Sequence, residues 1–420
     1  MGRIAVALLS CVVFGCASPQ NTPPAEKPDE ARAALRMAIE SMGGEDAVAA
    51  INGMRLQTRG EWQGMGLPAP MPYTAEIVHQ LPDCQHWNMT AMGMTMASGM
   101  RGGEGWSMMG SPAARVAGEM RKHYQEMGYG WWITLVRPLL HTEGLTLSGG
   151  ALETVDGEPV RRVNVTFPGG RKYVLTFTGG DKTVLTGYEG DVTYWKGGDC
   201  VVRAKFADHT AFGDITLPSS TEVQLLIDGK VEETVKERWT SVQWNPEIPD
   251  GFFDMPDTDV VFMDPAAKQA AESQGVMVLH KGAYSGTGAT IKKAMALCTD
   301  AGLVPMGSVT MVCVTDPATV KDESELRAEI VVPVMLFGPP PKLPEGVTMK
   351  TIPAGTVASI TARGPYGEAD VAALEALMAW IAEAGHEVTG PPRIVYFHDP
   401  EMFVAEDLVS EVQVPINEKG

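Results

Sequence analysis

Two glutamates in the C-terminal third of the chain are the side chains best placed to do chemistry. Glu329 lies in the segment LRAEIVVPV, and Glu411 lies 82 residues later in the segment LVSEVQVPI. Because side chains alternate between the two faces of a strand, the apolar neighbours of each glutamate share one face and the carboxylate points to the other. A carboxylate on such a face can attract an organic cation, and if water is excluded it can serve as a general acid or base.

The glutamates belong to a tandem repeat with an offset of 82 or 83 residues. Residues 281–284, Lys-Gly-Ala-Tyr, recur as residues 363–366, Arg-Gly-Pro-Tyr, and Asp316 and Asp399 both precede proline. Such an ordered duplication predicts two like modules related by a pseudo-twofold axis. The predicted strand, helix, strand and strand are 276–281, 287–300, 309–314 and 326–334 in the first copy, and 349–362, 367–384, 393–398 and 408–416 in the second.

Each module has one helix for three strands, so its helix can cover only one face of its sheet. We therefore expect Glu329 and Glu411 on the uncovered face. If the two modules pair sheet to sheet, both carboxylates line the cleft between them.

Residues 276–416 resemble the GyrI-like effector-binding domain, the ligand-binding module fused to many AraC-type and MerR-type regulators. The most specific matching segments are residues 325–334, 352–355, 363–366, 380–381, 390–393, 399–400 and 410–416. The resemblance implies a tandem pair of modules that encloses a small-molecule cleft with a buried acidic group and an aromatic lining. It marks Glu411 and Glu329 as the acidic candidates. The aromatic candidates that it implies are Tyr284, Tyr366, Trp380, Tyr396 and Phe397.

This set favours capture of a small apolar, aromatic or cationic ligand. Two alternatives stay open, in which the glutamates are structural hydrogen-bond acceptors, or Glu411 is the general acid or base of a hydrolase that acts on a reactive small molecule. The regulators' DNA-binding helices have no counterpart here. The formal net charge of −19 also opposes phosphate backbones, so no nucleic-acid partner is predicted.

The preceding region reads mainly as short alternating strands joined by glycine-rich turns. Helical spacing occurs only in residues 30–51, interrupted at 42–44, and in residues 114–140. One large antiparallel sheet curved around a helical element is expected. The predicted strands are 55–62, 73–80, 86–96, 161–167, 172–178, 183–188, 222–227 and 231–242.

This layout resembles the LolA-like lipoprotein and lipoprotein-carrier superfamily over residues 31–256, in particular at segments 103–106, 214–218 and 244–249. The resemblance implies a half-barrel whose concave face accepts acyl chains or another apolar partner, and it brings no catalytic residue. A lipid or lipoprotein handling factor is thus a further alternative. The predicted fold class is α+β, with a curved antiparallel N-terminal sheet and duplicated C-terminal β-α-β-β modules of pseudo-twofold symmetry.

Methionines gather in a short part of this region. Thioethers are soft ligands that suit copper(I). Alternation of Met92, Met94 and Met96 on one strand face equally suits an apolar core or a lipid-facing groove, and we favour that interpretation. No catalytic motif, cofactor or metal site is predicted. The clustered residues are Met89, Met92, Met94, Met96, Met100, Met108 and Met109.

The first residues predict export and lipidation. Arg3 precedes an apolar run, and Val-Phe-Gly-Cys resembles a lipobox that would leave Cys16 diacylated; an ordinary secretory signal is the alternative. Because Ala17, and not an aspartate, follows Cys16 at the position that would signal inner-membrane retention, we expect an outer-membrane anchor facing the periplasm. In that compartment Cys84 with Cys200, and Cys298 with Cys313, could form disulfides.

The chain is thereby divided into a signal peptide, a proline-rich tether that begins at the lipidated cysteine, two globular domains and a linker. The expected boundaries are 1–15 for the signal, 16–30 for the tether, 31–256 for the LolA-like domain, 257–274 for the linker and 275–420 for the GyrI-like domain.

Overall fold

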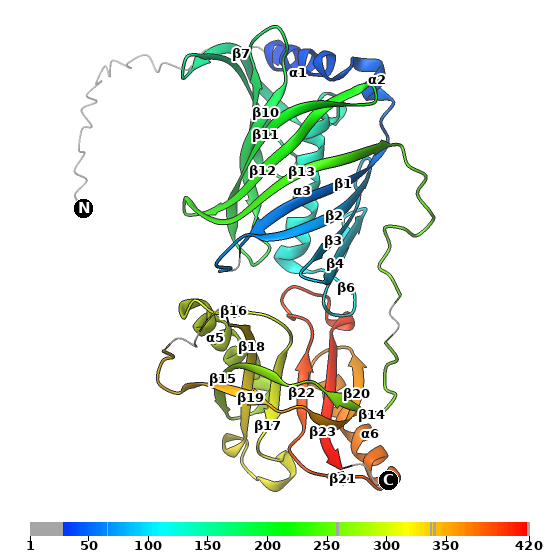
Figure 1. Ribbon diagram of the computed structural model, residues 1–420, viewed down its shortest axis with the longest axis vertical. Helices are drawn as coiled ribbons and strands as arrows, with labels where there is room; N and C mark the ends of the chain where they lie inside the picture. Colours follow the sequence, from blue (N-terminus) through cyan, green and yellow to red (C-terminus); the bar gives the residue numbers. More distant parts are fainter. Residues whose placement is uncertain (1–27, 65, 258–259, 337, 339–341, 418–420) are drawn as a thin grey trace, which may run out of the picture.

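The computed structural model describes residues 28–417 except 65, 258–259, 337 and 339–341. It contains two open antiparallel sheets with few helices, which confirms the α+β class. One sheet lies above the other in Figure 1, and a long connection joins them. The expected signal peptide, Cys16 and most of the tether lie outside the described residues.

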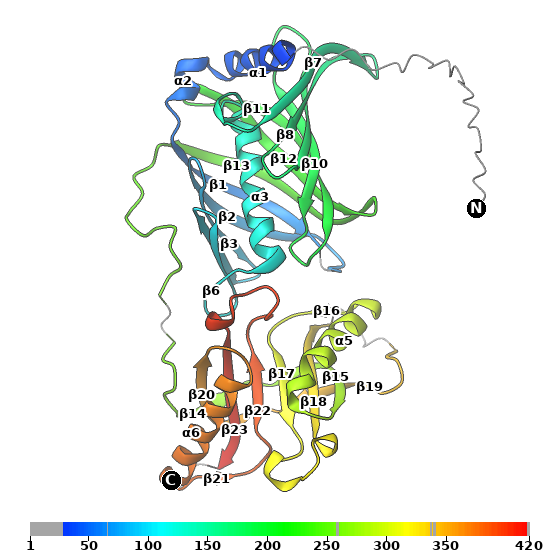
Figure 2. The same cartoon turned by 180° about the vertical axis from the view of Figure 1, so that it is seen from behind.

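The N-terminal sheet has 13 strands in the order β6-β5-β4-β3-β2-β1-β13-β12-β11-β10-β9-β8-β7. It curves around α3, as both ribbon views show (Figures 1 and 2). Its helices are α1 (Pro28–Met42), α2 (Glu45–Ala49), α3 (Gly118–Leu135) and α4 (Pro138–His141). Its strands are β1 (Gly53–Gln63), β2 (Met71–Gln80), β3 (Cys84–Ala91), β4 (Met94–Arg101), β5 (Glu104–Met109), β6 (Ala114–Arg115), β7 (Thr146–Val155), β8 (Glu158–Thr166), β9 (Lys172–Thr178), β10 (Leu185–Thr193), β11 (Asp199–Phe212), β12 (Ile215–Ile227) and β13 (Lys230–Trp244).

Strands β5, β7 and β11 lie in segments for which the sequence predicts no strand, and two predicted elements are divided in the structure. The single strand expected at 86–96 is the hairpin β3-β4, because Met92 and Gly93 both adopt positive φ angles and turn the chain. The helix expected at 114–140 is divided into α3 and α4, because Val136, with φ of 59°, ends the first of them just before Pro138.

The C-terminal sheet has the order β14-β20-β23-β22-β17-β18-β15-β19, with β16 and β21 paired beside it. Helices α5 (Thr287–Asp300) and α6 (Glu368–Ala384) pack on one face, in front of the sheet in Figure 2. The two modules meet edge to edge through β17 and β22, so they form one continuous sheet and do not pair face to face. The strands are β14 (Ala266–Ala270), β15 (Ser273–Lys281), β16 (Val304–Pro305), β17 (Val309–Cys313), β18 (Arg327–Met335), β19 (Val347–Ile352), β20 (Gly355–Arg363), β21 (Glu387–Val388), β22 (Arg393–Tyr396) and β23 (Val409–Asn417).

A long two-stranded ribbon ties the outer edges of the modules together. β15 pairs with β19 in the first module and β14 pairs with β20 in the second. The register is the same in both halves, since the residue numbers of partners such as Ala266 and Ser359, or Ser273 and Ile352, always sum to 625. The leading strand of each module therefore begins beside the other module. The expected strand 349–362 is interrupted at Pro353, and β14 occupies part of the segment expected to be a linker.

Segment 397–408 of the second module docks against β6 and the start of α3. Val116 forms a β-bridge with Phe403, and the Ala117 amide donates to the Met402 carbonyl at 2.7 Å. The Arg115 guanidinium contacts the Asp407 carboxylate at 2.6 Å. Burial alone would raise the pKa of Asp407, but the hydrogen bonds and charge of Arg115 hold that pKa below its usual range.

The two disulfides considered from the sequence are absent, because the four described cysteines are all free. Cys84 and Cys200 lie on β3 and β11, which are separated by four intervening strands. Cys298 on α5 and Cys313 on β17 lie in the same apolar core, where burial raises the pKa of each thiol to about 11. Among the described helices none combines the length and the apolar character needed to cross a bilayer.

Candidate functional site

Both glutamates project from the sheet face opposite the helices, as their strand alternation predicts. Ala328 and Ile330 flank Glu329 and belong to the core under the helices, so Glu329 points the other way. The same holds for Glu411 in β23, where the neighbouring Val412 lies in that core. The sheet face that the helices leave uncovered is therefore formed by residues that alternate, along each strand, with residues of the helix-covered core.

Each glutamate forms an ion pair with a lysine from the leading strand of the other module. Lys268 of β14 contacts Glu411 Oε1 at 2.5 Å, and Lys350 of β19 contacts Glu329 Oε2. Lys268 and Lys350 are separated by 82 residues, as are Glu329 and Glu411, so the two pairs are pseudosymmetric copies. The ribbon places these lysines because it carries each leading strand across to the opposite module.

The Glu411 carboxylate lies at the centre of a buried polar network. Its residue is 7% exposed, and Oε1 accepts hydrogen bonds from the Ser359 hydroxyl and, at 2.9 Å, from the Gln413 side-chain amide. Gln413 in turn accepts from Arg393 Nε at 2.7 Å. Burial lowers the pKa of Arg393, and the charge of Glu411 opposes that shift. A buried carboxylate with this many donors is held in one position.

The surroundings of Glu329 are more apolar and more open. Its side chain is 20% exposed, against 9% for Glu411. Val312 lies opposite Glu329 in the register of β17 and β18, and it packs with Val331 and Ile352 on the uncovered face. The two halves of this face therefore differ, with an apolar patch in the first module and a hydrogen-bonded network in the second.

The predicted aromatic lining is not brought together with the glutamates. Tyr284 donates to the carbonyls of Thr315 and Arg327 at 2.6 and 2.8 Å. Tyr366 donates to the equivalent carbonyls of the second module, those of His398 and Val409. These repeated bonds fix the start of each helix against its sheet, which is a structural role.

The other three aromatic candidates are also separated from the carboxylates. Trp380 lies on α6, packs against the helix-covered core and contacts His386, with ring centroids 5.2 Å apart. Tyr396 lies opposite Ser410 in the register and packs into the helix-covered core, since pleating places it on the face opposite Glu411. Phe397 follows β22, is half-buried, and donates its amide to the Val409 carbonyl.

The residues that do surround the glutamates include several that sequence reasoning missed. The sequence predicts a linker at Lys268, and it predicts a strand at Lys350 and Ser359 without indicating the partner of that strand. The matching 82-residue offsets of the lysines and the glutamates were a usable signal. Their contact could not be foreseen, because it depends on the crossing of the ribbon.

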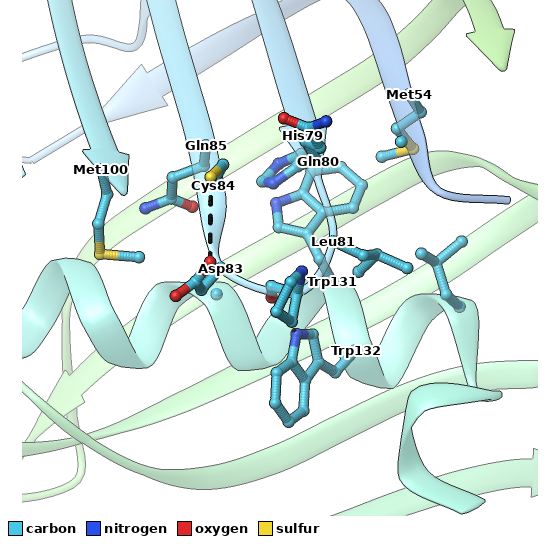
Figure 3. A pocket seen from close by; sticks show the side chains of 14 residues that line it. Met54, His79, Gln80, Leu81, Asp83, Cys84, Gln85, Met100, Trp131 and Trp132 are labelled. Carbon is cyan, nitrogen blue, oxygen red and sulfur yellow. Dashed lines mark hydrogen bonds between the residues drawn. The ribbon is translucent and has the colours of Figure 1, made fainter. Parts of the chain in front are cut away.

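The N-terminal domain contains a small apolar cavity between α3 and the β2-β3 turn (Figure 3). Its volume is about 20 Å³, roughly the room that one water molecule needs. The rings of His79 and Trp131 pack at its edge, with centroids 4.1 Å apart and planes inclined at 48°, and Trp132 donates to the Pro82 carbonyl at 2.9 Å. Binding of an acyl chain at this place therefore requires α3 to move away from the sheet.

A second, wide hollow of about 660 Å³ lies over strands β1, β2, β11, β12 and β13. Its lining carries charges of both signs, with four basic side chains beside three glutamates. Arg238 pairs with Asp208 at 2.8 Å, and Lys236 lies 3.9 Å from Glu222. These charges are largely balanced within the protein, so the hollow has no marked preference for an anion or a cation.

Comparison with known proteins identifies the duplicated region. Residues 263–417 match the model of the GyrI-like small molecule binding domain family. Solved structures with similar parts include the EcmrR C-terminal domain, at 20% identity and TM-score 0.33 over 37% of this chain and 98% of that one. A LolA superfamily protein from Nitrosomonas europaea aligns at 12% identity and TM-score 0.36, over 53% and 96% of the two chains. A hydrolase from Listeria innocua aligns at 13% identity and TM-score 0.27, over 38% and 94%. No curated protein matches the chain significantly.

Proposed function

We infer, from the premise that residues 263–417 form a GyrI-like small-molecule binding domain, that this protein captures a small apolar or cationic ligand on the uncovered face of that domain. The observation that carries the proposal is the buried Glu411 carboxylate, held by Ser359, Gln413 and Lys268 on a face that no helix covers. A fixed carboxylate in surroundings of low water content is a strong recognition group for an organic cation.

Lys268 occupies the position at which a cationic ligand would contact Glu411. Lys268 neutralises Glu411, yet its side chain is 47% exposed and can swing into solvent. A cationic ligand would take the place of the Lys268 ammonium beside Glu411. Lys268 thus acts as a tethered competitor that lowers the affinity for cations.

Dye binding tests this arrangement. Rhodamine 6G serves as an apolar cation and Nile red as a neutral probe of similar size, with binding followed by fluorescence anisotropy. Glu411→Gln should weaken rhodamine 6G binding about tenfold or more, and Lys268→Met should strengthen it, because the first removes the recognition charge and the second its competitor. Neither change should alter Nile red binding. Equal rhodamine 6G affinity in all three proteins would sink the proposal.

We also propose that the ligand is captured outside the cytoplasm, by a protein that Cys16 anchors to the outer membrane. The lipobox-like segment and the proline-rich tether support this location. Cys16→Ser protein, expressed in a Gram-negative host, should lose both metabolic labelling by palmitate and its sedimentation with membranes, since a single polar serine cannot carry acyl chains. Unchanged sedimentation and labelling would contradict the anchor.

A further inference from the structure

Three methionines form a row across neighbouring strands at the edge of the N-terminal sheet. Met89 of β3 lies directly opposite Met96 of β4, and Met96 lies directly opposite Met109 of β5. Directly opposed residues of antiparallel strands project from the same face, with Cβ atoms about 5 Å apart. The three thioethers therefore lie side by side, although their residues belong to three different strands and are not neighbours in the sequence.

A fourth thioether adjoins the row. Met94 precedes Met96 by two residues on β4, so it projects from the same face, opposite Ala91. The exposed fraction rises along the group, from 5% for Met89 to 40% for Met94 and 47% for Met109. Core packing explains Met89 and Met96, which contact the main apolar cluster. It does not explain why two further methionines stand beside them in solvent.

The chemistry of this group selects one class of ligand. Thioethers are neutral, polarizable donors that bind soft monovalent ions and have little affinity for Ca²⁺, Mg²⁺ or Mn²⁺. On β2, the residue opposite Met89 is Ala75, so no charged side chain adjoins the row at that position. Methionine has three rotatable side-chain bonds, which allow sulfurs from adjacent strands to converge on one ion.

We propose that Met89, Met96 and Met109, assisted by Met94, form a binding site for a Cu(I) or Ag(I) ion. The exposed members of the row give the ion access from solvent, and the buried Met89 provides a ligand shielded from water. The sequence alone favoured an apolar core for these residues. The strand register changes that assignment, because it places the sulfurs in one row.

Silver titration of the full-length protein tests the site without redox side reactions. Thiols are first alkylated with iodoacetamide, because Cys84 is partly exposed and would bind the same ion. Isothermal calorimetry should then detect one Ag(I) per chain. Met96→Leu and Met109→Leu should each weaken that binding about tenfold or more, since leucine keeps the volume and removes the sulfur.

Two methionines of the other domain provide matched controls. Met378 on α6 and Met295 on α5 are 41% and 38% exposed. Because they lie on helices, neither belongs to a row of methionines on paired strands. Their replacement by leucine should leave silver binding unchanged. Because Met109 lies at the surface, Met109→Leu is expected to fold even if Met96→Leu does not. If Met109→Leu protein binds Ag(I) as tightly as the unsubstituted protein, the row is only an apolar surface and the metal site is refuted.

Discussion

When the pH falls from 7.5 to 5, the unsubstituted protein is expected to lose about 2 kcal/mol more of its free energy of unfolding than His79→Phe protein does. His79 is 7% exposed, and its Nε2 is buried without a hydrogen-bond partner. Burial lowers its pKa from 6.5 to about 3. The imidazole is thus held neutral against Trp131, beside the small cavity behind α3.

The direction of the effect follows from proton binding. Below pH 6.5 the unfolded chain protonates His79, whereas the folded protein does so only near pH 3. The unfolded state therefore gains protons first, and stability is lost as the pH falls through 6.5. Phenylalanine cannot titrate, and its ring can keep the contact with Trp131 while the cavity accepts its extra volume.

Urea denaturation at both pH values, followed by tryptophan fluorescence, measures the difference. His79→Gln is the matched second variant, since it removes titration but keeps a buried polar group. It should lose the acid sensitivity while lying below His79→Phe in stability at pH 7.5. The explanation fails if the His79→Phe protein loses as much stability between pH 7.5 and pH 5 as the unsubstituted protein does.

Lys268→Glu is expected to lower the free energy of unfolding by about 3 kcal/mol, because it sets a second carboxylate against the buried Glu411. The existing ammonium contacts Glu411 Oε1 at 2.5 Å, while Ser359 and Gln413 hold the carboxylate in place. Glu411 cannot turn away without breaking these hydrogen bonds. When the new side chain turns into solvent, Glu411 is left buried without its counter-charge, so the destabilisation persists in either orientation.

A double-mutant cycle isolates the contact between the modules. In Glu411→Gln protein, Lys268→Glu should cost at least about 2 kcal/mol less, since the neutral amide can donate to the new carboxylate. Lys350→Glu is the matched pseudosymmetric control. It should destabilise the protein less, because Glu329 is 20% exposed at its side chain and water screens the repulsion. An equal cost of Lys268→Glu with and without Glu411 would show that the two residues do not interact.

The local features of the C-terminal domain followed from the sequence. Helix α5 has the predicted limits, and the alternation around Glu329 and Glu411 assigns them to the face away from the helices. Periodicity suffices for this, because a strand or a helix determines the direction of its own side chains. The same reasoning failed at Met92, where one turn divided a strand that periodicity had joined.

What the sequence determined by itself is the duplication, the α+β class and the pair of outward-facing glutamates. Only the tertiary structure decided what those glutamates meet. The ribbon carries Lys268 and Lys350 into the opposite modules, and the pleat directs Tyr396 into the helix-covered core. The physical reason is that sequence spacing specifies the orientation of a side chain within its own element, whereas its partners depend on which strand edges meet. Those edges are joined by backbone hydrogen bonds between segments about 80 residues apart, and the choice among possible pairings is made by the packing of the whole domain.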